Sequence, residues 1–170
     1  MADLLALSSR VIDSGVVDEP VNRITNELSE VADGLAIVES FSHSVVLDAG
    51  EGLVAFDASH ARTGADVAAA IRGWSTTPVT HLVYTHGHAD HVGGSPAFAE
   101  AFGEMTVVGH TNVDARFERY EYTNDWNVRI NARQFGGVRG DYGMGDTPDF
   151  IPPTTLRPSH VVDDHDTITV

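Results

Sequence analysis

Four side chains that can bind a metal ion lie within six consecutive positions in the middle of the chain. They are His86, His88, Asp90 and His91. Neutral imidazoles and a carboxylate suit zinc and other borderline divalent cations. A single ion cannot use all four comfortably, because the adjacent Asp90 and His91 point in different directions, whereas two ions can share them. We therefore expect His86 and His88 to bind a first ion, and Asp90 and His91 to bind a second.

The residues around this cluster predict where it lies in the fold. The apolar run at 79–84 precedes the ligands and indicates a buried strand. The ligands then follow the carboxyl end of a strand, where open α/β sheets place their binding sites. Gly87, Gly93 and Gly94 allow the loop to fold tightly. The alternative is a chance cluster on an exposed loop, but the density of ligands favours a metal site.

The segment from Thr85 to Gly94 resembles the HxHxDH signature of the metallo-β-lactamase superfamily. The resemblance implies an αββα sandwich built from two similar halves, with a metal site at one edge. It also implies hydrolysis by a di-zinc-activated hydroxide, with Asp90 binding metal and orienting the hydroxide as the catalytic residue. The signature says little about the substrate, because the superfamily contains lactamases, thioesterases, lactonases, sulfatases and nucleases.

The rest of the chain alternates short apolar runs with helical patterns, which predicts an α/β fold of the α+β sandwich type. We expect strands at 35–38, 44–47, 53–57, 79–84 and 106–109, and helices at 63–72, ended by Gly73, and from Ser95 to Gly103. Residues 1–30 are expected to form an N-terminal arm with a short helix around 22–31. Residues 31–170 would form a partial metallo-β-lactamase-like domain, with a helical or irregular insertion at about 112–147.

A later segment is rich in hydrogen-bond donors suited to a tetrahedral oxyanion, namely Asn127, Asn131, Arg133 and Gln134. Their spacing places Asn127, Asn131 and Gln134 on one helix face. The stretch looks like the alkyl-sulfatase branch of the superfamily, although the double arginine of that branch is Ala132-Arg133 here. We predict an alkyl sulfate or related ester as substrate. The alternatives are a solvated helix whose arginines pair with acids, or a thioester, lactone or phosphodiester substrate.

The other histidines are expected to be structural or surface groups, although two of them have a second candidate role. His110 ends a predicted strand on the same side as the ligand-bearing segment from Thr85 to Gly94, which we call the metal loop. It is therefore the best candidate for a supporting contact to the ligands. His160 lies at a separation from His91 that suits a third histidine for the first ion in several superfamily members. Its local sequence, however, lacks the strand and glycine that usually precede that ligand.

Composition limits the class of partner. The formal charge is −15, from 25 acidic and 10 basic residues, and such a surface repels nucleic acid and anionic membranes. There is no cysteine, which excludes disulfides and thiolate ligands. No apolar stretch approaches the length of a membrane span, and no signal peptide is evident. We therefore expect a soluble, cytoplasmic protein that acts on a small-molecule ester, with no nucleic-acid or membrane partner.

The end of the chain also leads to a prediction. Residues 166–170 alternate like the start of a new strand, whereas the resemblance implies further metal ligands from a second half of the fold. We interpret the chain as an N-terminal portion of a longer hydrolase, apparently truncated, with weak metal binding and little or no activity, or as a non-catalytic fragment. One face of its sheet would then be uncovered and apolar, which favours self-association.

Overall fold

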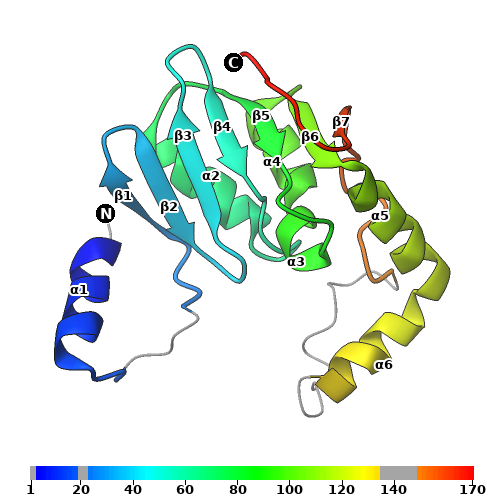
Figure 1. Cartoon of the computed structure of the whole chain (residues 1–170), viewed down its shortest axis with the longest axis horizontal. Helices are drawn as coiled ribbons and strands as arrows, with labels where there is room; N and C mark the ends of the chain where they lie inside the picture. The colour runs from blue at the N-terminus through cyan, green and yellow to red at the C-terminus, as the bar shows by residue number, and fades with distance from the viewer. Residues whose placement is uncertain (1–2, 19–22, 135–148) are drawn as a thin grey trace.

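In the described residues, seven strands form one mixed sheet in which each strand pairs with the next along the chain (Figure 1). The computed structural model describes residues 3–18, 23–134 and 149–170. Strands β1 to β4 are antiparallel neighbours, and β4 to β7 are parallel neighbours. Their bounds are β1 (Glu27–Ala32), β2 (Leu35–Glu39), β3 (Ser44–Asp48), β4 (Leu53–Phe56), β5 (Val79–Val83), β6 (Thr106–His110) and β7 (His160–Val162).

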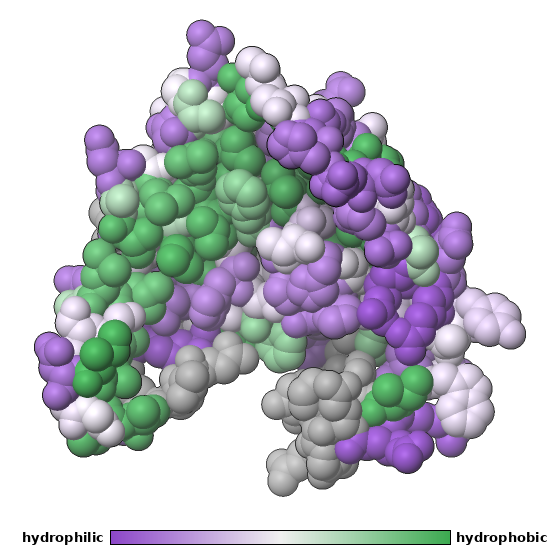
Figure 2. All heavy atoms as spheres, in the orientation of Figure 1, coloured by the Kyte–Doolittle hydropathy of each residue, from purple (hydrophilic) through white to green (hydrophobic). Residues whose placement is uncertain are grey.

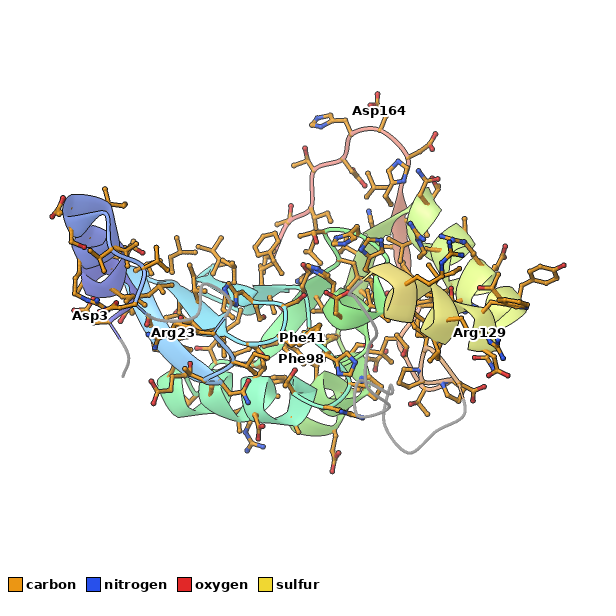
Figure 3. All side chains as sticks on the ribbon, turned by 90° about the horizontal axis from the view of Figure 1, so that it is seen from below. Asp3, Arg23, Phe41, Phe98, Arg129 and Asp164 are labelled. Atoms are coloured by element: carbon orange, nitrogen blue, oxygen red, sulfur yellow. The ribbon has the colours of Figure 1, made fainter. Side chains whose placement is uncertain are left out.

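The described residues form six helices, of which those between the parallel strands β4, β5 and β6 cover one face of the sheet. The helices are α1 (Leu4–Ser14), α2 (Gly64–Trp74), α3 (Ala89–Val92), α4 (Ser95–Phe102), α5 (Thr111–Thr123) and α6 (Asp125–Gln134). Helix α2 joins β4 to β5, and α3 and α4 join β5 to β6. Figure 3 shows α2 and α4 on the same side of the sheet, whereas the segment with Asp164 projects on the opposite side. Because β4 and β5 are parallel neighbours, the loops at their carboxyl ends lie next to each other.

The core lies between the sheet and helices α2 and α4. The strand register aligns Val46, Ala55 and Leu82 across β3, β4 and β5, and all three side chains are fully buried. Ile71 from α2 and Phe98 from α4 are also fully buried. Burial of a side chain of this size contributes roughly 1.5–3 kcal/mol. The core therefore fixes the strand ends from which the candidate site projects.

The opposite face of strands β2 and β3 is apolar and partly exposed. Leu35 pairs with Leu47, and Ile37 pairs with Val45, on the side away from the core. Leu47 is 40% exposed, and Figure 2 shows hydrophobic residues gathered over this part of the molecule. The predicted apolar face is therefore present. Self-association through it stays a prediction.

The predicted α/β class is confirmed, and each of the five predicted strands has a counterpart in β2 to β6. The helix expected around 22–31 is wrong, because residues 27–32 pair with β2 as strand β1. A helix instead occupies Leu4–Ser14, where the Asp3 carboxylate accepts a hydrogen bond from the Ala6 amide and Gly15 ends the helix at φ 67°. Alternation alone could not distinguish 27–32 from a helix, since the pairing with β2 is a tertiary contact.

Two element ends also differ from expectation. Helix α2 continues through Gly73 to Trp74, because a glycine in a helix costs only about 0.5–1 kcal/mol, which packing of the helix offsets. Residues 166–170 form no strand, and the last strand is β7, which pairs with β6. The expected boundary at residue 30 falls within β1. In the described part of the chain, no helix has both the length and the apolar character that a membrane crossing requires.

Candidate metal centre

The four predicted ligands lie together just beyond the carboxyl end of β5. His86 belongs to the segment that follows the strand, His88 is the N-cap residue of α3, and Asp90 and His91 lie in that helix. The loop that follows β4 contacts this segment directly, because the Ala58 amide donates a hydrogen bond to the His91 carbonyl oxygen over 2.7 Å. The site is therefore assembled from the ends of two adjacent parallel strands, β4 and β5.

His86 and His88 direct one ring nitrogen each at the other. The distance from His86 Nε2 to His88 Nδ1 is 2.9 Å. Two nitrogens bound to one tetrahedral zinc at about 2.0–2.1 Å would be about 3.3 Å apart, so a small separation of the rings would admit an ion. Burial, followed by nearby positive groups, lowers the pKa of both imidazoles. A lowered pKa favours the neutral form of each ring, which is the form that binds metals.

Asp90 and His91 form a second pair of donors. Asp90 Oδ2 lies 3.6 Å from His91 Nε2, close to the separation of about 3.3 Å that two ligands of one tetrahedral zinc require. The rings of His86 and His91 are 4.1 Å apart between centroids, so the two pairs are neighbours. The grouping expected from the sequence, one pair for each ion, is compatible with these distances.

Asp57, which the sequence analysis did not select as a site residue, holds His91 in place. Its carboxylate accepts hydrogen bonds from His91 Nδ1 over 2.7 Å, and from the Thr85 amide and hydroxyl over 2.8 and 2.6 Å. Burial lowers the pKa of His91, but the hydrogen bond and charge of Asp57 outweigh this, so the pKa is raised. In the neutral form of His91, with its proton on Nδ1 donated to Asp57, Nε2 would be available to a ligand.

The backbone at Asp57 is unusual for a residue with a side chain. Asp57 is only 4% exposed and has a φ of 62°, in the left-handed region. Aspartate tolerates this region better than most residues, but the conformation still costs free energy. The sequence contains one hint of its role, namely an acidic residue at the end of the apolar run 53–57, beside the strand that leads to the ligands.

Close packing explains all three glycines around the ligands, and a Cβ atom at Gly93 would lie 2.5 Å from the Ala89 carbonyl oxygen. A Cβ atom at Gly94 would lie 2.0 Å from the Ala58 carbonyl oxygen, and one at Gly87 would lie 2.9 Å from Arg116 Cβ. A side chain at either position would force the segments apart. The crowding around Gly87, Gly93 and Gly94 agrees with the prediction that these glycines permit a tight loop.

Arg116, on α5, brings positive charge to the ligand cluster. Its side chain packs against Gly87, and its charge helps to lower the pKa of His86 and His88. Its guanidinium also lies 5.6 Å from the centroid of the Tyr120 ring. Arg116 was not predicted as a binding residue, because nothing in the local sequence pattern shows that the first turns of α5 pack against the metal loop.

The residues predicted to bind substrate lie on α6, and the contacts described there differ from those of the metal loop. Asn127 is 4% exposed, and its amide nitrogen donates to the Thr123 hydroxyl over 2.7 Å and to the Asn124 carbonyl over 3.1 Å. It therefore joins α5 to α6, and this contact speaks against a role in binding substrate. Arg133 is exposed. The side chains of Asn131 and Gln134 lie outside the described residues.

His110 and His160 form hydrogen bonds away from the predicted ligands. His110 is the N-cap residue of α5, where its Nδ1 accepts from the Asn112 amide, and its Nε2 lies 2.8 Å from the Asp163 carbonyl oxygen. His160 Nε2 lies 2.6 Å from Asp166 Oδ2. These contacts place both histidines in the packing of the C-terminal segment, so the structure provides no support for their roles near the ligands.

Within residues 3–18, 23–134 and 149–170, no three His, Asp or Glu side chains converge as a ready-made metal site. The donors instead form the two pairs described above. The residue types fit zinc, and small side-chain movements would bring each pair to ligand distances.

Comparisons with known proteins bear on the fold and the family of the chain. A family model described as the metallo-beta-lactamase superfamily matches residues 37–168. The metallo-β-lactamase with the HARLDQ motif from Cronobacter sakazakii is 14% identical, with a TM-score of 0.61 over 88% of this chain and 50% of that chain. The metallo-β-lactamase MIM-1 from Novosphingobium pentaromativorans is 19% identical, with a TM-score of 0.56 over 84% of this chain and 46% of that chain.

These identities are low enough that the similarity concerns the fold alone. The chain spans about half the length of these two structures. The sec-alkylsulfatase Pisa1 from Pseudomonas sp. is 22% identical over 53% of this chain and 16% of that chain. Its TM-score of 0.45 is too low to bear on the substrate. No curated protein matches the sequence.

Proposed function

Because the chain belongs to the metallo-β-lactamase superfamily, we propose that it contributes its ligand loop to a metal-dependent hydrolase. The main support is the pairing of donors, His86 with His88 and Asp90 with His91, at separations of 2.9 and 3.6 Å. The chain spans about half the length of the structures it resembles. The activity of a complete enzyme, with ligands from a second half, is therefore part of the proposal.

The metal proposed is zinc, with one ion for each donor pair. A bound divalent ion would act as a Lewis acid and lower the pKa of water toward neutrality. Neutral His86 and His88 would bind the first ion, and Asp90 and His91 the second. Asp57 would orient His91 and increase the basicity of its free nitrogen, as carboxylates commonly do for ligating histidines.

An anionic ester is the substrate that the described residues support best. The aliphatic part of the Arg116 side chain packs against Gly87, between His86 and His88, and its charge contributes to lowering the pKa of both histidines. A positive charge near the ligands would stabilise negative charge on a bound sulfate and in the transition state. We therefore keep an alkyl sulfate or related anionic ester as the proposed substrate. Arg133, Asn131 and Gln134 remain candidates for further contacts. Thioesters, lactones and phosphodiesters are the alternatives.

The metal requirement can be tested first by isothermal titration of the chain with zinc, and by hydrolysis assays with an alkyl sulfate, a thioester, a lactone and a phosphodiester. We expect zinc binding that is lost in a His86→Ala/His88→Ala variant, and any turnover should disappear with a chelator. Turnover that persists unchanged after metal removal would contradict the proposal.

The substrate class can be tested with Arg116→Ala and, as a matched control, Arg72→Ala, which removes an exposed arginine in the last turn of α2. We expect Arg116→Ala to reduce kcat/KM for anionic esters by roughly 10- to 100-fold, in the range of a lost charge-assisted hydrogen bond. Neutral esters and the control should be little affected. An equal loss for neutral and anionic esters would exclude Arg116 as a recognition residue.

A further inference from the structure

Ser42 lies between the two donors of the second pair. It is in the loop that joins β2 to β3, and it is 8% exposed. Its Oγ atom is 2.8 Å from Asp90 Oδ2 and 3.1 Å from His91 Nε2. The predicted ligand motif does not include this residue, since it is 48 positions before Asp90.

The three atoms form a triangle with edges of 2.8, 3.1 and 3.6 Å. Three ligands on one face of a tetrahedral zinc site would be about 3.3 Å apart, which is close to the mean of these edges. We propose that Ser42 is the third donor of the second cation position, completing with Asp90 and His91 a face of ligands drawn from two separate parts of the chain. This inference rests on the proposed function, because it concerns the same metal centre.

When His91 is neutral, the triangle contains more lone pairs than protons. When His91 is neutral, its one ring proton is on Nδ1, which donates to Asp57, so Nε2 presents a lone pair. Asp90 also presents lone pairs, and the hydroxyl of Ser42 has a single proton to donate. Three electron-rich atoms thus face one proton. An additional proton or a metal ion between them would relieve the resulting repulsion.

The loop is held firmly enough to place the hydroxyl. The neighbouring Ser40 donates from Oγ to Asn26 Oδ1 over 2.8 Å and accepts from the Ser59 hydroxyl over 2.9 Å. The Ser40 amide donates to His43 Nδ1 over 3.1 Å. These bonds attach the loop both to the segment before β1 and to the segment after β4. Ser42 therefore needs little ordering on metal binding, which lowers the entropic cost of using a weak, neutral ligand.

A cysteine at this position provides a sharp test, because the natural chain contains no cysteine and no other thiolate can contribute. In Ser42→Cys titrated with cobalt(II) under reducing conditions, we expect a thiolate-to-cobalt charge-transfer band in the near ultraviolet, and binding tighter than in the unmodified chain. The control is Ser75→Cys, at the opposite end of β5 from the ligands. It should give no such band.

Removal and retention of the hydroxyl test the same role without a new ligand. Ser42→Ala should weaken binding of the second equivalent of zinc by roughly 10-fold or more, whereas Ser42→Thr should retain it. Circular dichroism of each variant verifies that it is folded. The cobalt spectrum and the zinc titration are both independent of enzymatic activity.

The outcomes separate this inference from the proposed function. If the unmodified chain binds two equivalents of metal, while Ser42→Cys gives no charge-transfer band and Ser42→Ala binds normally, Ser42 is not a ligand and the metal-dependent function stands. If the unmodified chain binds no zinc or cobalt, both the inference and the metal centre of this chain are wrong. A band in Ser42→Cys together with weaker binding in Ser42→Ala supports both.

Discussion

The metal loop and the α5–α6 segment both contain polar residues whose spacing predicted a binding site, but their side chains make different kinds of contact in the structure. In the metal loop, the polar side chains contact partners from distant parts of the chain: His91 contacts Asp57, and Asp90 contacts Ser42. In α6, Asn127 contacts residues of the immediately preceding turn, and Arg129 lies 5.3 Å from the ring centroid of Trp126. Figure 3 shows Arg129 at the outer end of the molecule.

The difference shows which kind of pattern indicates a binding site. A helical spacing of polar residues is satisfied equally well by local capping and by solvent, so it says little about function. A cluster of ligands at the end of a buried strand is different, because polar groups there are costly unless other parts of the fold supply partners. Those partners, Asp57 and Ser42, are what distinguish the metal loop from α6.

The largest expected effect is the loss of metal binding when the first donor pair is removed. His86→Ala/His88→Ala should weaken binding of the first zinc equivalent by more than about 100-fold, since removal of ligands exceeds the effect of removing their supporting partners. Zinc titration of this variant, beside an Asn127→Ala variant that should bind normally, measures the contrast. An equal loss of zinc affinity in both variants would contradict the conclusion that the metal loop, and not α6, binds the metal.

Asp57→Asn tests whether the buried carboxylate that contacts His91 contributes to zinc affinity in addition to the ligands themselves. Asparagine keeps the shape and tolerates the left-handed backbone at φ 62°, but it removes the charge that faces His91. We expect zinc affinity to fall by roughly 10- to 100-fold. The matched control is Asp48→Asn, an exposed carboxylate at the end of β3, which should leave the affinity unchanged. An unchanged affinity in Asp57→Asn would show that His91 needs no such support.

Close packing around the ligands predicts an unequal response of two glycines. Gly94→Ala should lower the free energy of unfolding by about 1–3 kcal/mol, because the new Cβ would meet the Ala58 carbonyl oxygen. Gly73→Ala, in α2, should raise it by about 0.5–1 kcal/mol, since no described atom lies within 4 Å of a Cβ built there. Urea unfolding of both variants provides the comparison. A neutral Gly94→Ala would mean that the loop can move apart without cost.

Asn127→Ala should affect stability without affecting the metal. The substitution removes the donor that joins the end of α5 to α6, and we expect a loss of about 1 kcal/mol in the free energy of unfolding. Thermal unfolding and zinc titration of the same preparation measure the two properties. Weaker zinc binding with unchanged stability would reverse the assignment of Asn127 to a structural contact.

The smallest expected effect is that of Arg133→Ala. This exposed residue should contribute less than about 0.5 kcal/mol to stability and nothing to metal affinity. Hydrolysis of an alkyl sulfate by the same variant is the informative measurement. A clear decrease in kcat/KM would make α6 part of the substrate site and would narrow the contrast between the two regions.

Much of the fold followed from patterns within short segments. The apolar runs of β2 to β6 and the helical spacing of α2 and α4 are local signals, and the structure bears them out. Strand β1 was predicted as a helix because its residues become a strand only by pairing with β2. The last strand was predicted at 166–170 but lies at His160–Val162, because it is the parallel contact with β6 that makes this short segment a strand.

The sequence by itself determined the identity and spacing of the four donors, their place after a buried strand, and the superfamily of the chain. These are properties of a continuous segment, and covalent geometry restricts how such a segment can fold. Only the tertiary structure decided that Asp57, Ser42 and Arg116 surround those donors, and that Asn127 does not. Such neighbours come from the ends of separate elements, and burial against a shared core, rather than distance along the chain, determines which of them meet.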